Sequence, residues 1–195
     1  MELPALLLVA LAVAVIIKTF LVQPFYVPSE SMLPTIEVND RVMISKLNYR
    51  FSDPQRGDIV VFISPFNDEI DNETFLGSVG RHILEAVGVR TASADDLIKR
   101  VVGIEGDTIE VKDGHLYVNG MQANEPYLAQ AGVMPEFSAV VVPADSVFVM
   151  GDNRGVSYDS RRFGAIPEED LLGEAVIRIW PPSRLGSIDS VTSGQ

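Results

Sequence analysis

Three hydroxyl side chains lie close together in the stretch PSESMLPT, residues 28–35, and each is a potential oxygen nucleophile. They are Ser29, Ser31 and Thr35, and the flanking residues Pro28 and Pro34 restrict the backbone and remove amide donors. In an ordinary turn such hydroxyls usually bond to their own backbone. The stretch therefore predicts catalysis only if another part of the chain supplies a proton acceptor.

The chain has no cysteine and only two histidines, so we looked for that acceptor among the carboxylates and lysines. A Ser-Lys pair is a known variant of the serine hydrolase arrangement. Lys99 lies in the apolar stretch LIKRVVG, where Ile98, Val101 and Val102 should exclude water and lower the pKa of the amine. In an extended strand Arg100 points to the opposite face. A lysine in a strand is by itself usually structural or solvated, so Lys99 gains meaning only beside the hydroxyls.

A third stretch, GDNRGVSYDSR at residues 151–161, combines two aspartates, two arginines and two serines in a turn-forming context. Taken alone, it predicts a β-turn with ion pairs among Asp152, Arg154, Asp159 and Arg161. Its charged groups are also of the kind that could support an active site.

Composition excludes several classes of function. The formal charge of -12 across 195 residues repels phosphate backbones, so we expect no nucleic-acid partner. Without cysteine the chain has no disulfide or thiolate metal site, and His82 and His115 are too few for a histidine cluster. We therefore expect no metal and no cofactor.

The elements that must position these residues begin with an apolar run from Leu3 to Val22, which is long enough to span a bilayer as a helix. A cleaved secretory signal is the alternative, but its apolar part is shorter and follows a basic segment. We predict an uncleaved transmembrane anchor over residues 1–23. Lys18 at the C-terminal side of the run would, by the positive-inside rule alone, leave the following domain in the cytoplasm.

Residues 24–186 are predicted to form one mainly β domain, an antiparallel folded sheet or partial barrel with short turns. Strands are expected at 40–47, 57–65, 139–142, 146–150 and 174–180, with a loop at 121–137. The stretch 98–120 predicts a buried strand and then a hairpin that turns at Asp113-Gly114. Residues 67–96 predict a helical insertion, and 187–195 a flexible tail.

Together, PSESMLPT, GDIVVF, KRVVGIEGD and GDNRGVSYDSR resemble, in order and type, the motifs of the bacterial type I signal peptidases, which are membrane-anchored Ser-Lys proteases. The resemblance runs from the anchor to Leu185. It implies that Ser31 is the nucleophile, Lys99 the general base, Ser29 an oxyanion donor and Ser157 a group that orients the lysine. It further implies a supporting role for Asp152, Arg100, Asp159 and Arg161, and shallow substrate pockets for small side chains lined by Val27, Met32, Ile36, Leu97 and Ile98.

The resemblance implies a serine endopeptidase that removes N-terminal signal peptides from exported precursor proteins by cutting after Ala-X-Ala. The expected location is the cell membrane, in a single pass, with the catalytic domain on the extracytoplasmic side, against the Lys18 signal. The expected partners are precursors, membrane lipid and the export translocon. The short interval from Arg100 to Met150 is similar to the compact bacterial form of the family.

Three alternatives remain at this point. A specialised maturation protease, processing pilins or conjugation factors, would share the motifs. The self-cleaving SOS-response repressors have a related Ser-Lys fold but need a DNA-binding segment, which the apolar N-terminus and the acidic charge do not provide. A membrane-tethered β domain without catalytic activity would use the serines only to cap turns and leave Lys99 solvated.

Overall fold

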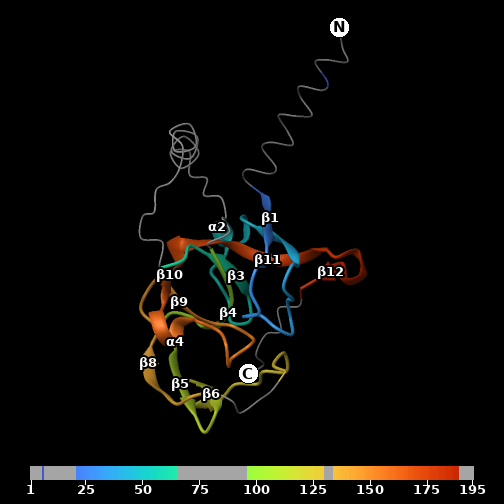
Figure 1. Ribbon diagram of the computed structural model, residues 1–195. Helices are drawn as coiled ribbons and strands as arrows, with labels where there is room; N and C mark the ends of the chain where they lie inside the picture. The colour runs from blue at the N-terminus through green and yellow to red at the C-terminus, as the bar shows by residue number, and fades with distance from the viewer. Residues whose placement is uncertain (1–5, 7–20, 66–95, 130–133, 189–195) are drawn as a thin grey trace.

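A short strand with no exposed residue, β3 (Ile59–Phe62), lies near the middle of the larger of two antiparallel sheets. All four of its residues are buried, as expected for a run of β-branched and aromatic side chains covered on both faces. The computed structural model describes residues 6, 21–65, 96–129 and 134–188. Within them the protein is mainly β and antiparallel, which confirms that part of the predicted fold class (Figure 1).

The larger sheet has eight strands in the order β1-β2-β11-β3-β4-β9-β10, with β12 paired to β11. Their bounds are β1 Val22–Tyr26, β2 Arg41–Ser45, β4 Leu97–Gly103, β9 Ser146–Met150, β10 Ile166–Pro167, β11 Leu171–Trp180 and β12 Gly186–Ser187. The ten-residue strand β11 pairs with β2, β3 and β12 and contains register shifts against β2 and β3. Such irregularities bend a strand, so β11 curls the sheet.

The smaller sheet has the order β7-β6-β5-β8 and lies at the end of the domain away from β1 (Figure 1). Its strands are β5 Thr108–Lys112, β6 His115–Val118, β7 Met121–Gln122 and β8 Phe137–Val141. Short helical turns complete the structure: α2 Asn48–Phe51, α4 Ser160–Phe163, η1 Glu168–Asp170 and η2 Pro182–Arg184.

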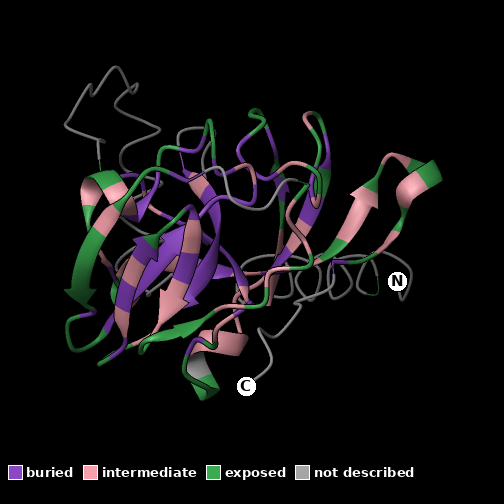
Figure 2. Cartoon of the chain, turned by 90° about the horizontal axis from the view of Figure 1, so that it is seen from below, coloured by how far each residue is buried: buried purple, intermediate pink, exposed green. Residues whose placement is uncertain are grey.

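Alternation along the central strands divides the core into layers. Ile59 and Val61 of β3 pack in one apolar cluster with the loop that follows β1, while Val60 and Phe62 pack in another with β9. A third cluster joins β9 to the smaller sheet. Figure 2 shows the buried residues concentrated in these central strands, with exposed residues on the outer loops and edges. The site residues lie where the layers meet.

The hairpin predicted at Asp113-Gly114 is confirmed. β5 and β6 pair on either side of it, and both turn residues have positive φ, 51° and 75°, as a type I′ turn requires. Asn119-Gly120 makes a second turn with positive φ at both residues and leads into β7. The short β7 and the start of β8 occupy the two ends of the range predicted as loop.

The other predicted strands are also found, with β9 matching residues 146–150 and β11 beginning three residues earlier than expected. At the C-terminal end, Ser187 lies in β12 and Ile188 is buried, which are the first two residues of the predicted tail. At the N-terminal end, β1 begins at Val22, within the range assigned to the anchor.

Of the predicted membrane anchor, only residues 6 and 21–23 are described. Residues 67–95 of the predicted helical insertion also lie outside the described residues. Among the residues that are described, no helix has the length and apolar character needed to cross a bilayer.

The pairing of β11 with β2 generates a prediction about stability. At Gly173 the φ angle is +151°, and an added Cβ would lie 2.4 Å from the carbonyl oxygen of Ser45. Because that oxygen belongs to the backbone of β2, it cannot move aside easily. We expect Gly173→Ala to lower the free energy of unfolding by about 2 kcal/mol or more, measured by urea denaturation. Gly186→Ala is the control, since nothing lies within 4 Å of its added Cβ, and an equal loss in both variants would contradict the expectation.

Candidate active site

The loop after β1 is held in a defined position by its own backbone. Leu33 N–H donates to the carbonyl of Glu30, and Ile36 N–H donates to that of Met32, which closes a tight turn around Ser31. The side chains of Met32 and Ile36 are fully buried in the cluster beneath the loop. Ser31 is 8% exposed, so it is a buried residue that keeps a small contact with solvent.

Lys99 reaches this hydroxyl from strand β4. Its Nζ lies 2.8 Å from Ser31 Oγ, with a hydrogen bond between them, and it also donates to the carbonyl of Ile98 at 2.8 Å. The lysine is 2% exposed. Residues 68 positions apart in the sequence thus form a direct contact between an alcohol and a buried amine.

Burial lowers the pKa of Lys99 to about 8, because removing water disfavours the ammonium form more than the charges of Asp159 and Asp152 favour it. The amine is therefore largely uncharged in mildly alkaline solution. An uncharged amine within hydrogen-bond distance of a hydroxyl can accept its proton, which is the arrangement of a general base and its nucleophile.

The segment 151–161 forms a wall beside the loop. Asn153 N–H donates to the carbonyl of Ser31 at 3.0 Å, and the side-chain amide of Asn153 donates to the carbonyl of Glu30 at 3.2 Å. At Gly151 an added Cβ would lie 2.4 Å from the carbonyl oxygen of Ser31 and 2.3 Å from Ser157 Oγ. Glycine is therefore needed there for the wall to approach the loop.

Asp159 and Arg161 support this wall as an ion pair. Two nitrogens of the Arg161 guanidinium donate to the two Asp159 oxygens, each at 2.8 Å, and Gly151 N–H donates to the same carboxylate at 3.1 Å. Burial raises the pKa of Asp159, but the hydrogen bonds and charge of Arg161 outweigh it and the pKa is lowered overall. The carboxylate remains ionised and also caps helix α4.

A second ion pair is more deeply buried and connects strand β4 to the segment 151–161. The buried guanidinium of Arg100 binds both oxygens of Asp152, at 2.9 and 2.7 Å, and donates to the carbonyl of Gly57. Thr35 Oγ1 donates to Asp152 Oδ2 at 2.5 Å. Asp152 thus joins strand β4 to the loop that carries Ser31, through Arg100 on one side and Thr35 on the other.

The structure brings together most of the residues singled out from the sequence. Ser29 Oγ lies 3.3 Å from Ser31 Oγ, and Val27, Met32, Ile36 and Ile98 share one buried cluster. Leu97 packs instead against the cluster formed by β3 and β9. Ser157 is buried beside Asp159 and helps to lower the pKa of that carboxylate. In the described part of the chain, Lys99 Nζ hydrogen-bonds to Ser31 Oγ and to the carbonyl of Ile98.

Two features of the site were not apparent from the sequence. Thr35 was noted only as a turn hydroxyl, because its partner Asp152 lies 117 positions away. Arg154 binds Glu125, which lies in a range predicted as loop. No local pattern signals either contact, since both depend on which distant segments the sheet brings side by side.

The chain matches the sequence model of the family described as signal peptidase, peptidase S26, over residues 1–180. Signal peptidase I of Leptolyngbya laminosa is 40% identical over 173 residues, which cover 88% of this chain and 75% of the relative. Probable signal peptidase I-2 of Synechocystis is 40% identical over 186 residues, or 95% and 76% of the two chains. The crystal structure of a signal peptidase I from Enterococcus faecalis matches with 28% identity and a TM-score of 0.46, over 63% of this chain and 97% of that one.

Burial of the Lys99 amine predicts a pH-dependent cost in stability. Unfolding returns the pKa from about 8 to about 10.5, so the unfolded chain binds more protons between these values. We therefore expect the free energy of unfolding of the wild type, relative to Lys99→Met, to rise from pH 8 toward 10.5 and to be constant below that window. Urea titrations at several pH values measure it. Lys112→Met, at an exposed position of β5, controls for loss of a lysine elsewhere, and a flat difference for Lys99→Met would contradict the burial argument.

The contact between Thr35 and Asp152 predicts a defect in positioning. Thr35→Val removes the hydroxyl with little change in shape, so Asp152 keeps Arg100 but loses its hold on the loop. We expect hydrolysis of an alanine ester to slow on the order of 10- to 100-fold, since small misplacements of reacting groups have effects of that size. Thr35→Ser should restore most of the rate. Equal rates in Thr35→Val and the wild type would show that the loop is held without Asp152.

Proposed function

The chain belongs to the signal peptidase family, peptidase S26, and we propose that Ser31 and Lys99 perform its peptide-bond cleavage as nucleophile and general base. As a member of this family it is a serine peptidase that removes signal peptides from precursor proteins. The proposal for the two residues rests on one observation, the 2.8 Å contact between a buried amine of lowered pKa and a hydroxyl.

In the first half of the reaction, Ser31 Oγ attacks the carbonyl carbon of the scissile bond while its proton passes to the uncharged Lys99 Nζ. The negative charge that develops on the carbonyl oxygen is stabilised by two donors, the backbone N–H of Ser31 and the hydroxyl of Ser29. Each such donor contributes about 3 kcal/mol to the stabilisation of a transition state. Lys99 then returns the proton to the leaving amine, which departs as the new N-terminus and leaves an ester on Ser31.

In the second half, water replaces the departed amine. Lys99, again uncharged, accepts a proton from the water as the water oxygen attacks the ester carbonyl, and the proton passes to Ser31 Oγ as the ester bond breaks. General base catalysis of each step is worth about 10² to 10⁴ in rate. One amine therefore serves both halves, which requires that it return to the uncharged state between them.

The charges around the amine fit this cycle. Asp159 and Asp152 lie close enough to stabilise the ammonium that forms transiently, but each is bound to an arginine. Their attraction for the proton on Lys99 is thereby weakened. The base can accept a proton during the attack without keeping it.

The substrate side of the proposal follows the buried cluster next to the nucleophile. Val27, Met32, Ile36 and Ile98 pack together beneath the loop and leave little depth there, which supports pockets that accept only small side chains. Leu97, directed to a different cluster, then contributes through its backbone at the start of β4. A shallow pocket rejects large side chains by overlap, which fits cleavage after Ala-X-Ala.

We further propose that residues 1–23 anchor the enzyme in the cell membrane, with the catalytic domain on the extracytoplasmic side. The apolar run from Leu3 to Val22 has the length of a bilayer span, and the loop carrying Ser31 follows within ten residues of its end. A signal peptide is cut beside its own apolar segment, so a nucleophile close to the lipid surface meets the cleavage point. Lipid and the export translocon would then be its neighbours.

Cleavage of an Ala-X-Ala peptide by the detergent-solubilised chain tests the proposal. Because only uncharged Lys99 accepts the proton, we expect kcat/KM to rise with pH through a midpoint of about 8. Ser31→Ala, Lys99→Met and Lys99→Arg should each reduce the rate by at least about 10³, since a guanidinium does not deprotonate.

Lys112→Met, which removes an exposed lysine far from Ser31, is the matched control and should cleave as the wild type does. A Lys99→Met variant that still cuts would rule out the proposed base. Sequencing the new N-termini made from mixed secretory precursors then separates general signal peptide removal from a specialised maturation role.

A further inference from the structure

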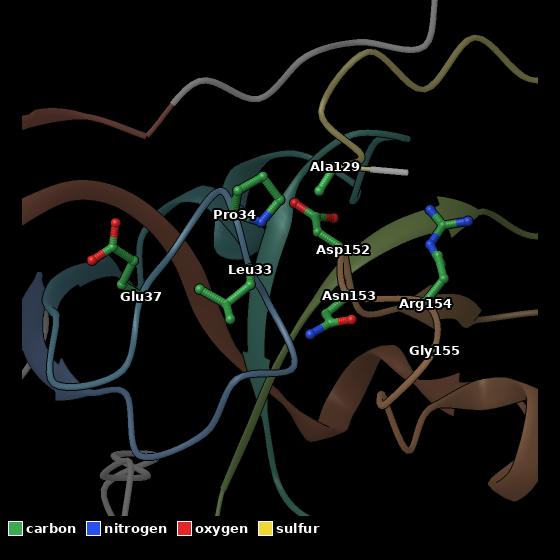
Figure 3. A pocket seen from close by; sticks show the side chains of 8 residues that line it. All are labelled: Leu33, Pro34, Glu37, Ala129, Asp152, Asn153, Arg154 and Gly155. Carbon is green, nitrogen blue, oxygen red and sulfur yellow. The ribbon is translucent and has the colours of Figure 1, made fainter. Parts of the chain in front are cut away.

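A cavity of about 400 Å³ lies on the side of the nucleophile loop that faces away from the buried cluster. Figure 3 shows the side chains that line it: Leu33, Pro34, Glu37, Ala129, Asp152, Asn153, Arg154 and Gly155. Three of them follow Ser31 within six positions, and four belong to the wall that binds the carbonyl of Ser31. The cavity is therefore built by the two segments that hold the nucleophile.

The loop presents different residues to its two sides. Met32 and Ile36 point inward, into the cluster shared with Val27 and Ile98. Leu33, Pro34 and Glu37 line the cavity instead (Figure 3). If residues before the cut lie over the cluster, as proposed above, the chain after the cut must leave on the other side of Ser31.

Asn153 connects the cavity to the backbone of the loop that carries Ser31. Its backbone N–H binds the carbonyl of Ser31 at 3.0 Å, its side-chain amide binds the carbonyl of Glu30, and it also lines the cavity. Since an extended chain advances about 3.3 Å per residue, the first two or three residues after the scissile bond reach this space.

The charges in the cavity wall are already paired. Asp152 binds Arg100, and Arg154 binds Glu125, with the side chains of both pairs buried. Glu37, at the exposed rim, is paired with Arg184. What remains for a ligand is the carbon surface of Leu33, Pro34 and Ala129, together with the amide of Asn153. Such a surface favours an uncharged side chain, because a charged one would lose water without gaining a partner.

We propose that this cavity binds the first residues of the polypeptide that follow the scissile bond, and that it selects uncharged side chains there. This inference rests on the proposed function of Ser31 and Lys99. It assigns Leu33 and Ala129, on opposite segments, a part in specificity on the leaving-group side of the reaction.

Two substrates that are identical up to the cut separate this proposal from the catalytic one. One continues for four residues after the cut. The other stops at the cut, where its C-terminal carboxyl group is esterified with a small alcohol. The measured quantity is the ratio of kcat/KM for the long peptide to kcat/KM for the ester, with the full-length chain in detergent. Leu33→Trp fills the cavity from the loop, and we expect it to lower this ratio about tenfold, the effect of a lost contact of about 1.4 kcal/mol.

Ala129→Phe fills the same space from the opposite wall without changing the nucleophile loop, and it should lower the ratio similarly. Leu185→Trp, at an exposed position outside the cavity, is the matched control and should leave the ratio unchanged. In the wild type, replacing an alanine by aspartate or lysine at the first two positions after the cut should lower kcat/KM for the long peptide.

A wild type that cleaves neither substrate would refute the proposed catalysis. A wild type that cleaves both, with a ratio unaffected by Leu33→Trp and Ala129→Phe, would overturn the cavity proposal alone. Equal loss of both activities in Leu33→Trp also leaves the ratio unchanged and counts against it.

Discussion

The site depends on the exclusion of water from one amine. Lys99 is placed in β4, beside the fully buried strand β3, and its Nζ meets the Ser31 hydroxyl where almost no solvent reaches. Desolvation then lowers the pKa of the amine, so that this normally charged group loses its proton in mildly alkaline solution. The two nearby carboxylates, Asp159 and Asp152, oppose this effect but do not outweigh it. Each carboxylate is bound through both of its oxygens to a guanidinium, which weakens its attraction for the lysine proton. The site therefore has negative charge close to Lys99, and the amine can still lose its proton.

The larger sheet supplies the precision that this chemistry needs. β4 carries both Lys99 and Arg100, whose side chains contact different partners, Ser31 and Asp152. β9 leads directly into the wall at Gly151, and β1 leads directly into the loop. Backbone hydrogen bonds between neighbouring strands therefore set the relative positions of base, wall and nucleophile. The loop that follows β7 is joined to the wall by the contact between Arg154 and Glu125.

Local patterns in the sequence were sufficient for the longer central strands and for the hairpin, because alternation and an Asp-Gly turn act over a few residues. They missed β1, β7, β10 and β12. The roles of Ser31 and Lys99 came from motif resemblance together with the apolar surroundings of the lysine. The bond between Thr35 and Asp152, the pairing of β12 with β11 and the cavity beside Leu33 could not be predicted in this way. Each depends on segments far apart in the chain, and their meeting is decided by the order of strands in the sheet, which no short stretch encodes.

The wall recognises the nucleophile loop through the main chain. Asn153 binds the carbonyls of residues 30 and 31, and Gly151 lies against the second of them, so neither contact involves the Ser31 hydroxyl. A variant in which Ser31 is replaced should therefore keep the fold of the wild type. Such a protein would bind an intact precursor without cutting it, so that the conformation of the bound precursor could be determined.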